Sequence, residues 1–259
     1  MAIDLSKMKA KLDSLRNKGD NGGGDKQSVL WKITDGDHDV RIVSPADGDP
    51  FRDLHFHYME VNGKNVSILC PKRNFGDECP ICEFASSLWK ESSGSGDQEG
   101  MKMAKSLFVK QRFFSPVLVR GEEDKGVRIW GYGKSTYETL LGLVLNPDYG
   151  DITDIDEGTD LTLTYGKISG ASYAQTKIQP RRKTSPLCND KVGGKDRCGE
   201  LLKNIPSVDT IYPRRSTADV QKALDEFLAD ETSAGEDVVK YNKTNTSRID
   251  QAYEELMGD

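Results

Sequence analysis

The sequence predicts a mainly β fold with a few helices, of the α+β class. Two observations support this prediction: short strand-like segments separated by turn residues fill the chain from Val29 to about Ile178, and one helix-like segment interrupts them. Five or more short strands with one intervening helix are typical of a small barrel of the OB type. With 259 residues, the chain is long enough to bury a core of its own.

The predicted strands are bounded by turn signals. Asn62-Gly63 predicts a two-residue hairpin turn, and Ser92–Gly100 reads as a polar loop. Ser135 with Glu138 resembles a capping box at the start of a helix, and a second helix is expected over Asp219–Ala229. The strand-like segments are 40–43, 54–61, 66–70, 107–119, 127–132, 161–168 and 172–178.

The N-terminus predicts a basic arm over residues 1–27. The run Gly19–Gln27 holds three consecutive glycines, which is typical of a flexible linker. The segment before it therefore reads as a tethered amphipathic helix, although a helix packed on its own domain is the alternative. Apolar residues recur there at helical spacing beside several lysines: Leu5, Met8, Leu12 and Leu15.

The overall composition excludes a membrane-spanning protein, because 30% of the residues are charged and no apolar run approaches about 18 residues. The first 18 residues alternate charge with sparse apolar residues and show no secretory signal. We therefore expect a reducing cytoplasm, where the five cysteines are thiols or metal ligands before they are disulfides.

The charge is unevenly distributed along the chain. The net charge is −6, but residues 218–259 hold 11 acidic and 4 basic residues, so residues 1–217 have a net charge of +1. Between Lys102 and Lys134 there are 8 basic and 3 acidic residues. A locally basic surface on a globally acidic protein is therefore expected, with an acidic C-terminal segment at 218–259.

Four residues have the pattern of a structural zinc site. Cys79 and Cys82 form a C-x-x-C knuckle, Cys70 ends the second strand of the predicted hairpin, and His57 lies on the first. Folding of the hairpin brings His57 close to Cys70, and three thiolates with one imidazole make a closed tetrahedral Zn²⁺ site. His55 is the competing ligand because it lies on the same face of the strand. The sequence thus predicts an OB-type core over 28–217 that carries a small zinc-binding subdomain at about 52–100.

Other readings of the cysteines are less favoured. A redox-active C-x-x-C requires a thioredoxin-like strand-to-helix context, which is not evident. Cys188 and Cys198 flank a polar loop without further ligands, so they read as ordinary thiols, with a reversible disulfide as the alternative.

The sequence offers little material for catalysis. Gly133-Lys134-Ser135 resembles the end of a phosphate-binding P-loop, but Arg128 stands where the motif requires glycine. The chain has only three histidines, two of them at the predicted metal site, and no motif places a general base. We therefore expect no enzyme.

Two strand-like segments alternate aromatic and basic residues. Single-stranded nucleic acid needs cations for its phosphates and flat rings on which bases stack, and these segments supply both. Core packing is the alternative role for each ring; Phe113 and Phe114 point oppositely, so one of them is expected in the core. The candidate nucleic-acid contacts are Lys110, Arg112, Phe113, Phe114, Arg128, Trp130, Tyr132, Lys134, Tyr137, Tyr173 and Lys177.

These residues also carry a family resemblance. The stretch from His57 to Cys82, with Asn62-Gly63-Lys64 inside it and Cys-Pro-Ile-Cys at its end, resembles the zinc module of the T-even phage helix-destabilising proteins, which are replicative single-stranded DNA-binding proteins. The resemblance continues through 106–110, 127–137 and 168–173, and spans roughly Trp31 to Lys177.

The resemblance implies a function and partners. It implies sequence-independent, cooperative binding of single-stranded DNA through a basic, aromatic-lined OB cleft, in phage DNA replication, recombination and repair within the host cytoplasm. It assigns one structural zinc to His57, Cys70, Cys79 and Cys82, self-association to the N-terminal arm, and docking of replication and recombination proteins to the acidic C-terminal segment. The compact Lys/Arg-Ser/Thr cluster of the family is absent from the N-terminus here, and the acidic tail is short. A zinc-ribbon adaptor that binds protein and not DNA is the alternative function.

Overall fold

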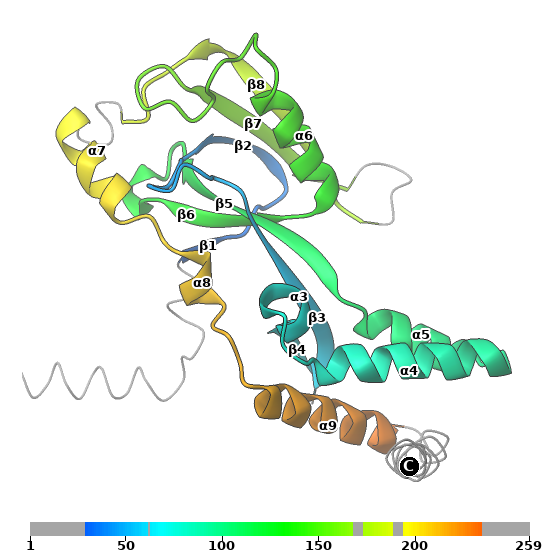
Figure 1. Cartoon of the computed structure of the whole chain (residues 1–259). Helices are drawn as coiled ribbons and strands as arrows, with labels where there is room; N and C mark the ends of the chain where they lie inside the picture. Colours follow the sequence, from blue (N-terminus) through cyan, green and yellow to red (C-terminus); the bar gives the residue numbers. More distant parts are fainter. Residues whose placement is uncertain (1–28, 62, 168–172, 189–193, 235–259) are drawn as a thin grey trace, which may run out of the picture. The chain divides into compact units, whose positions relative to one another are not determined.

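The computed structural model describes residues 29–61, 63–167, 173–188 and 194–234, in two compact units (Figure 1). We call them the sheet unit, formed by residues up to Asp53 and by Gln111–Tyr212, and the knuckle unit, formed by Leu54–Lys110 and the chain from Pro213 onward. The predicted N-terminal arm, Asn62, residues 168–172 and the end of the acidic segment from 235 lie outside the described residues.

The sheet unit is a mixed β-sheet. Its strands follow the order β1-β6-β5-β2-β7-β8, in which β1 runs parallel to β6 and the other pairs are antiparallel. The path begins at β1 and ends at β8, so the strands that the structure describes do not close into the expected barrel. The bounds are β1 Leu30–Trp31, β2 Gly36–Ile42, β5 Lys110–Val119, β6 Arg128–Tyr132, β7 Thr159–Gly166 and β8 Gln175–Thr184.

Alternating apolar residues of these strands build the core of the sheet unit. Val40 and Ile42 of β2 pack with Val117 of β5 and with Leu161 and Leu163 of β7 in one buried cluster. Helix α6 (Lys134–Val144) adds Leu140 to this cluster and packs against β8. The helix starts one residue before the expected Ser135, and Gly133 caps it without a side-chain hydrogen bond.

A buried arginine of β2 links the start of β7 to the segment after β8. The Arg41 guanidinium is fully buried, and its Nε donates to the Asp160 carboxylate at 2.9 Å. Its other nitrogens donate to the carbonyls of Asp154, Gly158 and Ser185. Burying a charge costs free energy unless the charge is paired and hydrogen-bonded, and these acceptors offset that cost for Arg41.

The end of the sheet unit contains a disulfide. Helices α7 (Gly194–Lys203) and α8 (Val208–Ile211) follow β8, and Cys198 of α7 is bonded to Cys188. This corrects the expectation of ordinary thiols. The two sulfurs lie in a small apolar cluster with Val43, Leu118 and Leu187, and it is this packing, which the sequence does not reveal, that brings them together.

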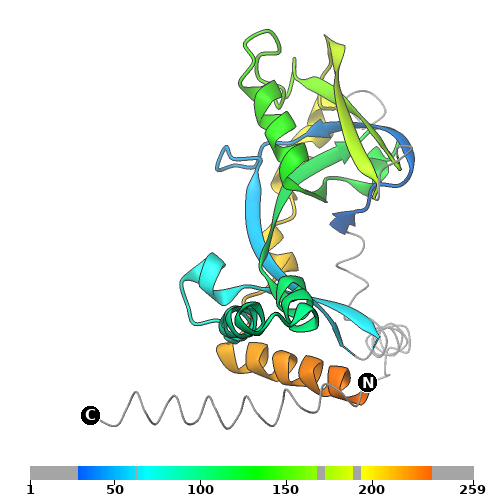
Figure 2. The same cartoon turned by 90° about the vertical axis from the view of Figure 1, so that its right-hand side faces the viewer.

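The knuckle unit consists of a hairpin and several helices. The hairpin pairs β3 with β4 in the register Val61↔Lys64, as the Asn62-Gly63 signal predicts, and Gly63 has φ +69°. Figure 2 shows α9 alongside the helices that follow the hairpin, and α9 contacts α4. The bounds are β3 Arg52–Val61, β4 Lys64–Leu69, α3 Pro71–Phe75, α4 Pro80–Ser95, α5 Gln98–Leu107 and α9 Thr217–Ala234.

Two expectations for the knuckle unit are wrong and one is confirmed. The segment Ser92–Gly100 is a junction between helices rather than a loop: α4 ends at Ser95, and the Asp97 side chain caps α5. Leu107 ends α5 instead of starting a strand. The helix expected over Asp219–Ala229 is present as α9. None of the helices in the described ranges is long and apolar enough to cross a membrane.

Candidate metal centre and nucleic-acid surface

Backbone geometry brings the four predicted metal ligands together. His57 is central in β3, Cys70 follows β4 as the N-cap of α3, and Cys79 is the N-cap of α4. Proline at the first position of each helix starts the turn directly after the cysteine, and Cys82 lies in the first turn of α4. The donor atoms of the four residues all lie within 4.8 Å of one another.

The distances within this Cys3His cluster fit a single metal ion. Cys70 Sγ lies 3.5 Å from Cys82 Sγ, and His57 Nε2 lies 3.4 Å from Cys79 Sγ and 3.5 Å from Cys82 Sγ. Around a tetrahedral Zn²⁺ with bonds of about 2.3 Å to sulfur, neighbouring sulfurs are about 3.8 Å apart. The donor set is also one that zinc prefers, so the residues fit the ion.

The ring of His57 is oriented for ligation. Its Nδ1 donates to the carbonyl of Leu107 at 2.7 Å, and this hydrogen bond orients Nε2 toward the cysteines. His55, the competing ligand, is not part of the cluster. Since residues i and i+2 of a strand are about 7 Å apart, only one of the two rings reaches the sulfurs.

Hydrogen bonds among the four side chains shift the pKa values of His57, Cys70 and Cys82. Burial disfavours the charged form of His57, but hydrogen bonds to Cys70, Cys79 and Leu107 outweigh burial and raise the pKa of His57 to about 9. Hydrogen bonds from Cys79 and Cys82 lower the pKa of the Cys70 thiol, and the pKa of Cys82 is raised by its hydrogen bonds with Cys70 and Cys79. A bound metal would replace these shared protons.

Several of the predicted nucleic-acid contacts are buried. Trp130 is 1% exposed, Tyr132 3%, Phe114 4% and Phe113 5%, and the rings of Trp130, Tyr132 and Phe113 belong to the core of the sheet unit. Arg128 is 8% exposed and forms an ion pair with Glu122 at 2.6 Å. In this conformation these rings offer no free face to a base, and the charge of Arg128 is already partnered.

The buried rings form a connected stack that reaches the surface at Tyr137. Phe113 and Tyr137 stack with ring centroids 4.0 Å apart and planes at 13°, and Phe51 meets Tyr137 edge-on. Beneath them, the hydroxyls of Tyr132 and Ser115 share a hydrogen bond of 2.6 Å. Burial raises the pKa of Tyr132, with Ser115 opposing the shift, so this phenol stays neutral. Tyr137 is half-buried and is therefore held in one orientation.

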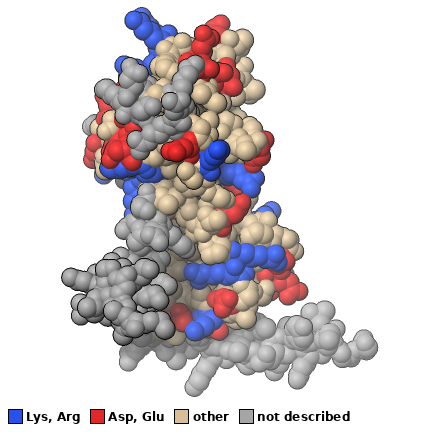
Figure 3. Space-filling view, turned by 90° about the vertical axis from the view of Figure 1, so that its left-hand side faces the viewer, with Lys and Arg blue, Asp and Glu red and all other residues tan. Residues whose placement is uncertain are grey.

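The remaining predicted contacts are accessible. In the sheet unit, Tyr173 is 71% exposed, Lys134 and Lys177 are exposed, and Arg112 is half-buried. In the knuckle unit, Lys110 is exposed and lies over the ring of Tyr58 at 5.8 Å from its centroid. Figure 3 shows that basic and acidic side chains are interspersed on the face that it draws.

Two further groups of accessible residues have the same chemistry, and neither is among the contacts predicted from the sequence. Strand β8 continues to Thr184, whereas the predicted strand ended at Ile178. The additional residues include three exposed cations, Arg181, Arg182 and Lys183. Arg181 forms an ion pair with Asp39. In the knuckle unit, Lys105 lies 5.1 Å from the ring centroid of Trp89, which also contacts Phe108. The run of three basic residues is visible in the sequence.

A buried Cys3His cluster that could hold a metal ion, together with accessible cations and aromatic rings, is typical of the class of nucleic-acid-binding proteins. A family model described as "gp32 DNA binding protein like" matches residues 34–207, about two-thirds of the chain. The chain therefore belongs to the gp32-like DNA-binding protein family, which confirms the resemblance seen in the sequence. This is a family of DNA-binding proteins. No curated protein matched the chain.

Proposed function

We propose that this protein binds single-stranded DNA without sequence preference, as a non-enzymatic component of phage DNA replication, recombination and repair in the cytoplasm of an infected bacterium. The observation that carries the proposal is the family match over residues 34–207. The accessible cations and rings support it, because phosphates and bases require both.

Different residues take different parts in the proposed binding. Phosphates contact the accessible cations, and bases stack on Tyr137 and Tyr173. The buried rings Phe113, Trp130 and Tyr132 support Tyr137 from below, in keeping with the ring stack described above. An OB-type arrangement stays a proposal for the sheet unit, supported by its short, mainly antiparallel strands and by α6 between β6 and β7. The proposed phosphate contacts are Lys110, Arg112, Lys134 and Lys177.

The proposed metal is one structural Zn²⁺ held by His57, Cys70, Cys79 and Cys82. The support is the donor set and its tetrahedral spacing. When bound, the ion would cross-link the hairpin to the starts of α3 and α4. Three thiolates and an imidazole leave no open position for a water, so the proposed role is structural.

The terminal segments have proposed roles that rest on sequence. Residues 1–27 mediate self-association along DNA, and residues 218–259 dock replication and recombination proteins. The basic character of the first segment and the acidic character of the second support this division.

A direct test compares fluorescence anisotropy titrations of labelled oligo-dT and of a duplex of equal length. The protein is expected to bind the oligo-dT more tightly, and the single variants Lys134→Ala and Lys177→Ala are each expected to weaken that binding. Lys222→Ala, an exposed lysine of α9, is the control with the same loss of charge. Equal affinity for both DNAs contradicts the proposal, and no binding of either favours the protein adaptor.

A further inference from the structure

Helix α9 buries an apolar stripe against the metal-binding module. Val220, Leu224 and Phe227 recur at i, i+4 and i+7, are 0%, 3% and 4% exposed, and join Ile81 and Ala85 of α4 in one cluster. This spacing puts the three side chains on one face of the helix.

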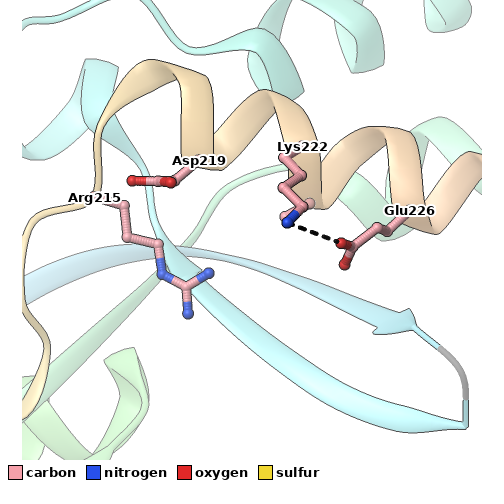
Figure 4. Close-up of a pocket in the computed structure, with 5 residues that line it drawn as sticks. Arg215, Asp219, Lys222 and Glu226 are labelled. Carbon is pink, nitrogen blue, oxygen red and sulfur yellow. Dashed lines mark ion pairs between the residues drawn. The ribbon is translucent and has the colours of Figure 1, made fainter.

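The opposite face of α9 stays polar. Figure 4 shows Arg215, Asp219, Lys222 and Glu226 along the helix and the turn before it, where they line a shallow hollow of about 350 Å³. Lys222 and Glu226 form an ion pair across one turn. Because the two signs of charge alternate, we assign no ligand to this hollow.

The cluster that receives α9 also contains metal ligands. Cys70 and Cys79 pack within it, and so does Leu107, whose carbonyl accepts the hydrogen bond from His57. Helix α4, which contacts α9, begins between Cys79 and Cys82. The surface under α9 is therefore built from segments whose positions the four ligands set.

A second anchor lies just before the helix. Arg214 forms an ion pair with Asp77, and its guanidinium lies 4.9 Å from the ring centroid of Phe75. Asp77 belongs to the connection between α3 and α4, which runs from one cysteine ligand to the next. This anchor thus also ends on a segment that metal binding would fix.

We propose that metal binding and the docking of α9 stabilise each other, so that α9 is a clasp that loosens when the metal is lost. The proposal rests on the metal site proposed above. It concerns a helix that lies outside the family match, which ends at residue 207. Coupling of this kind is reciprocal: what loosens α9 must weaken metal binding by the same factor.

Hydrogen exchange on the full-length protein tests the first direction without any variant. After the metal is removed with a chelator, amides of residues 220–228 are expected to exchange about tenfold faster or more, while amides of α6 in the sheet unit change little. If the protein carries the metal but its α9 amides exchange at the same rate before and after metal removal, the clasp is wrong and the metal site stands. A protein that neither carries nor takes up zinc overturns the metal site and the clasp together.

Transfer of the metal to a chromogenic chelator tests the reverse direction. Leu224→Gln, which puts a polar group into the docking face, is expected to speed metal release several-fold. Lys222→Gln on the polar face of the same helix is the control and is expected to leave the rate unchanged. If Leu224→Gln does not fold, Arg214→Gln removes the outer anchor and is expected to speed release in the same direction. Unchanged release from the folded docking-face or anchor variant overturns the proposal.

Discussion

At Gly158 the backbone passes so close to the buried Arg41 that no side chain fits. A Cβ at this position would lie 2.3 Å from the carbonyl oxygen of Asp154 and 2.5 Å from Arg41 Nη1. Because Arg41 also donates to the Gly158 carbonyl, the clash cannot be relieved without disturbing the hydrogen bonds of a buried charge.

We therefore expect Gly158→Ala to lower the free energy of unfolding by about 1–3 kcal/mol or more. Gly142→Ala is the control, since Gly142 lies in α6 with open space around its Cα. That change is expected to be neutral or stabilising by about 0.5–1 kcal/mol. Urea unfolding of both variants measures the difference, and similar effects of the two changes contradict the role of close packing at Gly158.

The two histidines of β3 should differ in metal retention. His57→Ala removes a proposed ligand whose Nε2 lies within 3.5 Å of two cysteine sulfurs, so the purified variant is expected to hold far less zinc than the wild type. His55→Ala changes a side chain outside the cluster and is expected to retain the metal. Elemental analysis of both variants decides between them, and greater zinc loss from the His55 variant reverses the ligand assignment.

Two aromatic residues should affect DNA binding in different ways. Trp130 is buried, so Trp130→Ala is expected to destabilise the fold by about 3–5 kcal/mol and to reduce binding only through that loss. Tyr173 is exposed, so Tyr173→Ala is expected to cost about 1–3 kcal/mol of DNA affinity while thermal stability stays unchanged. Thermal unfolding and oligo-dT titrations of both variants separate the roles. A stable Trp130→Ala protein with weak DNA binding contradicts this assignment.

At the scale of elements, the predictions succeed where a local pattern alone determines the structure. The hairpin follows from Asn62-Gly63 and the alternation around it, and α9 follows from apolar residues at helical spacing. The clustering of His57 with the three cysteines was predictable for the same reason, because C-x-x-C and a hairpin are both local signals.

The predictions fail where packing overrides composition. The glycines and serines of 92–100 read as a loop, yet Gly96 ends α4 with φ +76° and Gly100 lies against Ser92. A Cβ on Gly100 would come within 2.1 Å of Ser92 Oγ, so the glycine permits a close contact between two helices. Likewise, alternation shows that Trp130 and Tyr132 share a face, but it does not show whether that face is buried.

For the whole molecule, the distribution of charge sets the salt dependence of DNA binding. Each phosphate neutralised on single-stranded DNA lowers the slope of log affinity against log salt by about 0.7, because counterions are released. Four phosphate contacts, one for each proposed cation, therefore give a slope of about −3.

The acidic C-terminal segment should oppose binding through the same electrostatics. Residues 236–259 hold 6 acidic and 3 basic residues, so their removal takes away net negative charge and leaves the sequence of α9 whole. Since salt screens charges beyond about 10 Å at 0.1 M, we expect the truncated protein to bind oligo-dT more tightly at low salt, with a difference that shrinks as salt rises. A full-length variant with three of these six acids changed to Asn or Gln is the control, because it brings the net charge of the segment to zero and keeps the length. Titrations at several salt concentrations compare the two proteins. If only the truncation binds more tightly, chain length and not charge is responsible. If both bind more weakly, the acidic segment assists DNA binding.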